Sequence, residues 1–189
     1  MKKNPSLFGL LVAVVAGFVA FGIYFLFLSK KDHFLVDNPT GRVYYFRLNN
    51  GQEKIIPGKQ WVSVEVVKGK NTIAVFDDKK NKMYDSIFVV NKTRGLINIS
   101  HSEYYINRQY YGYNINKDSL LGELGKTKID GKDYYGAPKL FNRLYTEDFY
   151  YNVDEKYDKV IKNIDKIESR TKIFRKPDFL VYYKEYYSL

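Results

Sequence analysis

The sequence predicts a single N-terminal transmembrane helix, a β-rich domain in the form of an antiparallel sandwich, and a C-terminal α+β extension. Three observations lead to this fold class. Residues 7–28 carry no charge, residues 33–90 alternate between apolar and polar positions, and residues after 113 lose that alternation. The predicted divisions are an N-terminal flank (1–6), a transmembrane helix (7–28), a β-sandwich domain (29–112) and an α+β region with two helices (113–189).

The apolar run from Leu7 to Leu28 is 22 residues long and is bounded by Lys3 and Lys30. A helix of this length extends about 33 Å, enough to cross a hydrocarbon core of roughly 30 Å. Because the run ends in bulky side chains and Lys rather than in a cleavage site, it is predicted to be an uncleaved signal anchor. The short N-terminal flank favours a single-pass protein of the bacterial cytoplasmic (inner) membrane, with an extracytoplasmic, periplasmic C-terminal domain.

Small residues recur every four positions in this run, at Gly9, Ala13 and Gly17. In a bilayer such a row lets a second helix approach closely. We therefore expect transmembrane packing on these three residues, against a second copy of the chain or another membrane subunit. The lipid bilayer itself is the other expected partner. The alternative explanation is that Gly and Ala are simply common in membrane helices.

Six short runs with a two-residue period lie between His33 and Val90. Turn sequences rich in Asn, Asp, Gly and Pro separate them, which is typical of strands in an antiparallel sandwich. The predicted strands occupy residues 34–36, 43–48, 55–56, 61–67, 71–76 and 83–90.

Fourteen of the 19 tyrosines stand in adjacent pairs. Adjacent residues of a strand face opposite sides, so one ring of each pair is expected in the core and the other on the outer face. A strand-rich fold explains this pattern more simply than an exposed aromatic binding face. The pairs are 44–45, 104–105, 110–111, 134–135, 150–151, 182–183 and 186–187.

Three sequence segments resemble the small immunoglobulin-like or PEGA-like sandwiches of bacterial cell-envelope proteins: Val36–Thr40, Ile56–Lys59 and Lys68–Ile73. In those domains an asparagine turn, a proline-glycine turn and a glycine before a strand recur at similar intervals. Gly95–Asn98 and Tyr110–Gly112 are similar to segments of uncharacterised bacterial single-span proteins. The resemblance implies an extracytoplasmic module and supplies no catalytic residue.

After Tyr113 the pattern changes to a mixture of strands and helices. Ile129–Lys132 contains Asp-Gly and predicts a hairpin. Apolar residues at three- and four-residue spacing predict a helix over Asp154–Arg170. Pro177 suits the first turn of a last helix that runs to about Tyr187.

The sequence contains no recognisable catalytic, cofactor or metal site. It has no Cys, which excludes thiolate chemistry. It has only two His, and it lacks the metal-ligand spacing HExxH. Leu120–Thr127 ends like a phosphate-binding loop, but its first position is Leu where the motif requires Gly. His101 lies between Ser100 and Ser102, but sequence adjacency alone does not supply the orienting acid and oxyanion site that a triad needs.

The formal net charge of +10 indicates a further type of partner, an anionic surface. The excess of positive charge lies in residues 29–112. Lysines placed at strand edges to prevent aggregation explain this excess equally well. Nucleic acid is not an expected partner, because no reader motif is present. Contact with an anionic surface is predicted for Lys30, Lys31, Lys68, Lys70, Lys79 and Lys80.

These observations favour a membrane-anchored, non-enzymatic envelope protein that acts as an interaction or structural module, for example as a subunit of a membrane complex. Two alternatives remain open at this point. One is a hydrolase of envelope polymers, which needs clustered acids and a base. The other is a cytoplasm-facing scaffold that binds anionic ligands.

Overall fold

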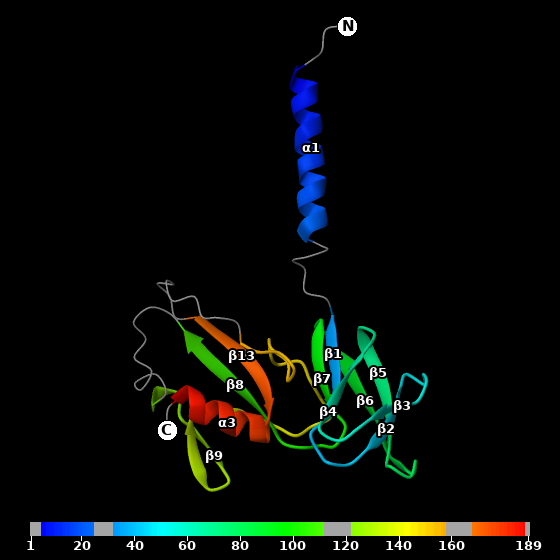
Figure 1. Ribbon diagram of the computed structural model, residues 1–189, viewed down its shortest axis with the longest axis vertical. Coiled ribbons are helices and arrows are strands. Elements are labelled where there is room, and N and C mark those ends of the chain that lie inside the picture. The colour runs from blue at the N-terminus through cyan, green and yellow to red at the C-terminus, as the bar shows by residue number, and fades with distance from the viewer. Residues whose placement is uncertain (1–4, 25–31, 112–121, 158–167, 188–189) are drawn as a thin grey trace. The chain divides into compact units, whose positions relative to one another are not determined.

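The computed structural model describes residues 5–24, 32–111, 122–157 and 168–187. The chain forms two compact units, Met1–Asp32 and His33–Leu189. The first contains helix α1 (Pro5–Ile23), and the second contains the described strands and the C-terminal helix α3 (Lys176–Tyr187) (Figure 1).

Helix α1 does not meet the requirement for a transmembrane helix. It spans Pro5–Ile23, and residues 25–28 of the predicted helix Leu7–Leu28 lie outside the described residues. Within the described part of the chain, no helix combines the length and apolar character needed to cross a bilayer. The predicted transmembrane helix, signal anchor and single-pass inner-membrane location with a periplasmic domain are therefore wrong.

Short strands make up most of the second unit. The six runs predicted between residues 34 and 90 coincide with the first six strands, which confirms the two-residue period there. These are β1 (His33–Asn38), β2 (Tyr44–Leu48), β3 (Lys54–Ile56), β4 (Gln60–Val64), β5 (Gly69–Phe76) and β6 (Lys82–Val90). The later strands are β7 (Arg94–Asn98), β8 (Tyr104–Tyr111), β9 (Lys126–Ile129), β10 (Lys132–Tyr135), β11 (Lys139–Phe141), β12 (Tyr145–Thr146) and β13 (Glu168–Arg175).

Two four-stranded sheets share one apolar core, which we call core 1. Sheet A has the strand order β12-β7-β1-β4, and sheet B has the order β3-β2-β5-β6. Both sheets contribute fully buried side chains to core 1, including Val36 and Ile97 from sheet A and Phe46 and Val75 from sheet B. The prediction of a purely antiparallel sandwich is wrong in sheet A, because β1 and β7 run parallel. Parallel strands are usually buried on both faces, and five of the six residues of β1 are buried.

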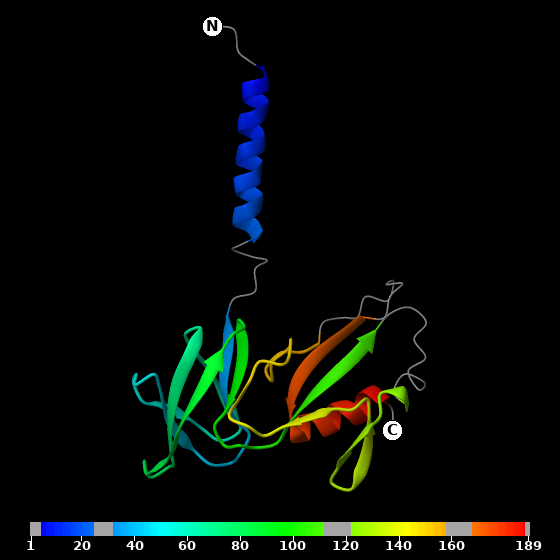
Figure 2. The same ribbon diagram turned by 180° about the vertical axis from the view of Figure 1, so that it is seen from behind.

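A third sheet covers the other face of sheet A. Sheet C has the order β11-β8-β13 and is antiparallel throughout. Leu35 and Leu96 of sheet A meet Tyr104, Phe141 and Ile173 of sheet C in core 2. Figures 1 and 2 show sheet C to one side of sheets A and B, with α3 beside it.

The second face of sheet C is covered by α3 and by the β9–β10 hairpin. Tyr105 and Phe174 of the sheet pack with Phe179 of α3 and Ile129 of the hairpin in core 3. The Phe179 ring lies 5.2 Å from the Tyr105 ring, centroid to centroid. Sheet C is therefore an internal layer with an apolar core on each face.

This layering decides where the paired tyrosines lie. Tyr104 and Tyr105 are both buried, because one faces core 2 and the other faces core 3. The expected division into one inner and one outer ring is wrong for this pair. It is confirmed for Tyr150 and Tyr151, which are exposed and buried respectively.

The C-terminal predictions are confirmed in part. The β9–β10 hairpin turns at Asp130 and Gly131, which both have positive φ. The last helix is also confirmed as α3. The helix predicted at Asp154–Arg170 is wrong at both of its described ends. Asp154 is in a turn and residues 155–157 have no regular secondary structure, whereas residues from Glu168 onward belong to β13, which pairs with β8 at eight positions. Residues 158–167 of that prediction lie outside the described residues.

A buried ion pair joins sheets A and C. Asp37, at the end of β1, is fully buried. Its carboxylate Oδ2 accepts hydrogen bonds from the Tyr104 hydroxyl at 2.6 Å and from Arg175 Nε at 2.9 Å, and Arg175 Nη2 donates to Oδ1. Burial, followed by the charge of Asp37, raises the pKa of Tyr104, so its hydroxyl stays protonated and remains a donor. All polar atoms of the Asp37 carboxylate thus have a partner.

Candidate functional site

The three residues predicted for transmembrane packing lie on α1. Gly9, Ala13 and Gly17 keep their four-residue spacing in the helix. A Cβ added to Gly9 or Gly17 would meet no described atom within 4 Å. The bilayer setting of that prediction does not hold, because α1 fails the requirement for a membrane span.

The lysines predicted for an anionic surface do not form one cluster. Lys30 and Lys31 lie outside the described residues. Lys68 and Lys70 are at the start of β5, and Lys79 and Lys80 follow its end. Because β5 has eight residues, the two pairs are separated by about 24 Å along the strand. They mark opposite ends of sheet B.

The residues around His101 form a polar turn. The Asn98 side chain donates to the Ser102 carbonyl at 2.8 Å and accepts from the Ser102 amide at 3.1 Å. The Ser100 and Ser102 hydroxyls are 2.8 Å apart. His101 has positive φ, and its ring packs on Tyr84 at 5.2 Å. These contacts organise the connection between β7 and β8.

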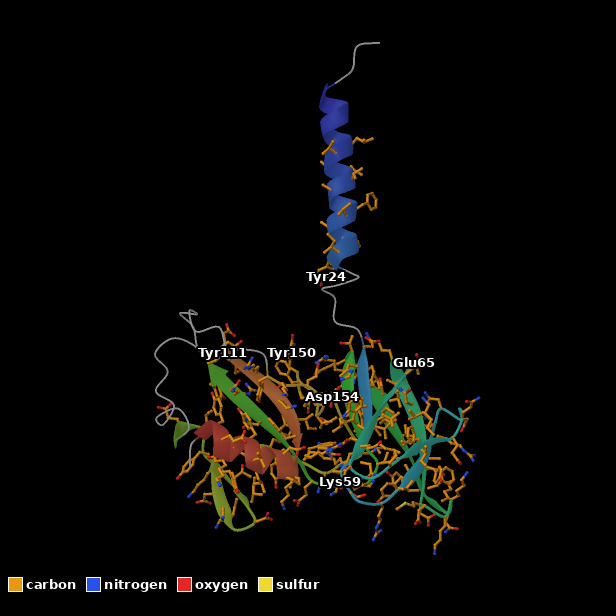
Figure 3. All side chains as sticks on the ribbon, viewed as in Figure 1. Tyr24, Lys59, Glu65, Tyr111, Tyr150 and Asp154 are labelled. Atoms are coloured by element: carbon orange, nitrogen blue, oxygen red, sulfur yellow. The ribbon has the colours of Figure 1, made fainter. Side chains whose placement is uncertain are left out.

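A charged cluster that sequence reading did not identify lies between sheets A and C. It contains His33, Arg94, Asp154, Glu155 and Lys172. Two of its pairs, His33 with Asp154 and Arg94 with Glu155, join residues that are 121 and 61 positions apart. Figure 3 labels Asp154 in this region. Arg94 donates two hydrogen bonds to the Glu155 carboxylate, at 2.7 and 2.9 Å. His33 Nε2 lies 3.1 Å from Asp154 Oδ1.

The charged cluster includes a His and two carboxylates close enough to hold one metal ion. Their hydrogen bonds do not fit that use. Both Glu155 oxygens already accept from Arg94, and one also accepts from the Asn152 amide at 2.7 Å. Burial by itself raises the pKa of Glu155, but these donors outweigh it and leave the pKa below its ordinary value. Arg94 and the Asn152 amide thus already use the Glu155 oxygens that a metal ion would need.

Lys172 is the buried base of the charged cluster. Its Nζ donates to the carbonyls of Asn152, at 2.6 Å, and of Glu155. Burial lowers its pKa to about 8, against the opposing effects of Asp154 and Glu155. The protonated form is therefore disfavoured in the fold relative to the unfolded chain.

We expect the free energy of unfolding to rise by about 1 kcal/mol between pH 7 and pH 9. Because the Lys172 pKa is lower in the fold, the unfolded chain binds more protons in this range, and stability increases with pH. Urea denaturation at several pH values measures the slope. Lys172→Met is expected to remove this component, whereas Lys128→Met, at an exposed position of β9, should keep it. Equal slopes in the wild type and Lys172→Met would contradict the assignment.

The face of sheet B that points away from core 1 carries exposed apolar side chains, and we call it the outer face. Ile55, Ile87 and Val89 are 51, 56 and 52% exposed. Tyr45 is opposite both Ile55 and Phe76 in the sheet, so these three share a face. Sheet B lies on the side of the second unit away from α3 (Figure 1).

Cations lie directly over the aromatic rings of the outer face. The Arg47 guanidinium carbon is 5.1 Å from the centre of the Phe76 ring, and Lys80 Nζ is 4.8 Å from that of Tyr45. Glu53 accepts hydrogen bonds from both Lys80 and Arg47, at 2.8 and 3.0 Å. These hydrogen bonds lower the pKa of Glu53 and keep it ionised. The Phe76 and Tyr45 rings are therefore covered by two cations that Glu53 holds in place.

A hollow of about 620 Å³ opens on the outer face. Thr72, Ala74 and Phe76 of β5 form its floor, and Asp85 and Ile87 of β6 form one side. Among the described residues that line it, Asp85 is the single carboxylate, and it pairs with Lys82. The site therefore combines an apolar floor with a basic edge.

Sequence reading found part of this surface. Lys70 and Lys80, at its two ends, were among the predicted contacts. Ile55, Ile87 and Phe76 were missed as surface residues, because a two-residue period shows that two faces exist but does not show which face is covered.

No protein-family model, no curated protein and no solved structure matches this chain. The resemblance to immunoglobulin-like or PEGA-like envelope domains therefore remains a prediction.

Proposed function

We propose that this protein is a non-enzymatic binding module that docks a partner protein on the outer face of sheet B. The observation that carries the proposal is the exposure of Ile55, Ile87 and Val89 beside a hollow whose lining includes Phe76. Contiguous apolar side chains with a polar edge are typical of interaction sites. These side chains are about half exposed in the chain, so a partner can bury the apolar area that remains in contact with water.

The charges of the outer face define the chemistry of the partner. Lys70 lies beside Val89 at one end of the face, and Lys80 and Arg47 lie over the rings at the other. A complementary surface presents apolar side chains at its centre and carboxylates at its edge. Such edge charges raise the association rate and set the orientation more than they raise affinity.

Support for a non-enzymatic role comes from the groups that line the hollow. General acid–base catalysis needs a titratable group in position to exchange a proton with the substrate. Asp85 is held by Lys82, and the remaining described lining offers apolar, hydroxyl, amide and basic groups. This composition suits recognition.

A photo-crosslinking side chain placed at Ile87 tests the proposal. In an extract of the native cells we expect one discrete adduct, and the additional substitution Ile55→Asp should weaken it by about tenfold or more. Ile55 is exposed, so the second change is expected to leave the fold intact.

Val181 of α3 provides the matched control position. It is 57% exposed, against 56% for Ile87, but lies on a different surface. An adduct from position 87 that is absent from position 181 supports the outer face. The same adducts from both positions, or an adduct at 87 that Ile55→Asp leaves unchanged, would refute it.

A further inference from the structure

A second hollow lies on sheet C and has a different chemistry. Its volume is about 560 Å³, and we call it the sheet C groove. Ile106, Arg108 and Tyr110 alternate along β8 and therefore line it from the same face of the sheet. Lys139 of β11 contributes to its lining, as does Tyr150, which Figure 3 labels. The lining residues lie between positions 92 and 171, so no single stretch of sequence encodes the groove.

Among the described residues that line the sheet C groove, three are cations and one is a carboxylate. The cations are Lys92, Arg108 and Lys139, and the carboxylate is Asp148. Arg108 is exposed and forms no ion pair among the described residues. The described lining of the groove therefore has an excess of positive charge, and no acid among the described residues forms an ion pair with Arg108.

Asp148 lies between the two lysines without a close contact to either. Its oxygens are 3.6 Å from Lys92 Nζ and 3.8 Å from Lys139 Nζ. These distances are longer than those of hydrogen-bonded ion pairs. Lys92 Nζ instead donates to the Glu147 carbonyl at 2.9 Å, which holds it at the wall of the groove. The ammonium groups of Lys92 and Lys139 thus both lie near the Asp148 carboxylate, at a position that favours negative charge.

We propose that the sheet C groove binds a small anion that carries at least two phosphate or carboxylate groups. One anionic group would contact the Arg108 guanidinium, whose planar donors match both kinds of oxyanion. Another lies between Lys92 and Lys139 and competes there with Asp148. The volume is within the range of small-ligand sites. This site is separate from the outer face of sheet B and does not depend on the function proposed for that face.

Titration calorimetry on the full chain tests this site with tripolyphosphate and with citrate as probes. Arg108→Gln is expected to weaken binding by about tenfold or more, since it removes a charged donor. Asp148→Asn is expected to strengthen binding, because it removes the competing carboxylate. Arg143→Gln is the matched control: it removes the same charge from an exposed loop position that does not line the groove.

The two probes distinguish the sources of the anion. Binding of tripolyphosphate alone identifies a phosphate site, binding of citrate alone identifies a carboxylate site, and binding of both supports an oxyanion site of broader specificity. Each of these results supports the proposed site only if Arg108→Gln weakens binding and Asp148→Asn strengthens it. Equal losses in Arg108→Gln and Arg143→Gln would show attraction by net charge and overturn the proposal. Absence of binding by both probes would do the same.

Discussion

Replacing Arg175 with Leu is expected to lower the free energy of unfolding by about 3–5 kcal/mol. The substitution leaves the Asp37 carboxylate fully buried without its counter-ion, and the Tyr104 hydroxyl alone does not offset that cost. The loss is a large part of the 5–15 kcal/mol that stabilises a typical domain. Urea denaturation followed by tyrosine fluorescence measures it.

A double variant separates loss of the pair from loss of packing. Asp37→Leu combined with Arg175→Leu removes both charges, so it is expected to be more stable than Arg175→Leu alone. Arg143→Leu, at an exposed position, should change stability by less than about 0.5 kcal/mol. A double variant that loses the sum of two separate large effects would show that Asp37 and Arg175 do not stabilise the junction as a pair.

Replacing Phe179 with Ala is expected to cost about 3–5 kcal/mol. The side chain is fully buried in core 3, where its ring lies 5.2 Å from Tyr105, 5.9 Å from Tyr134 and 6.1 Å from Phe174. Removing it opens a cavity between sheet C and α3, so α3 loses its main apolar anchor. We expect a lower denaturation midpoint together with faster proteolysis within Lys176–Tyr187.

Val181 on the same helix is the control for Phe179. Because it is 57% exposed, Val181→Ala is expected to change the unfolding free energy by no more than about 0.5 kcal/mol. Proteolysis of α3 that is equally fast in both variants would contradict the anchoring role of Phe179. It would indicate that helix propensity, rather than core 3, limits the stability of α3.

The predictions that succeeded depend on local signals. The hairpin at Asp130–Gly131 follows from the positive φ that its turn type requires, which Asp-Gly tolerates. The start of α3 follows from Pro177, whose φ suits a first helical turn and whose missing N–H costs nothing there. The first six strands follow from their period and their separating turns.

The predictions that failed share a dependence on distant contacts. Glu168–Arg170 directly follow a run of apolar residues with helical spacing and the prediction places them in the same helix, but the ladder with β8 supplies their backbone with hydrogen bonds in a strand. The parallel pairing of β1 with β7 leaves no local signature, because it joins residues about 60 positions apart.

The sequence by itself determined where the first six strands, the β9–β10 hairpin and the last helix form, because period, turn residues and proline act on the nearby backbone. Only the tertiary structure decided which faces are covered. Stacking of sheet C on sheet A buries Tyr104 and pairs Asp37 with Arg175 across 138 positions, whereas α3 and the β9–β10 hairpin bury Tyr105 on the other face. The folded layers also bring Lys92, Arg108 and Lys139 to one groove. Burial and charge pairing act between segments once they are packed, so these contacts depend on the arrangement of the layers and have no local pattern in the chain.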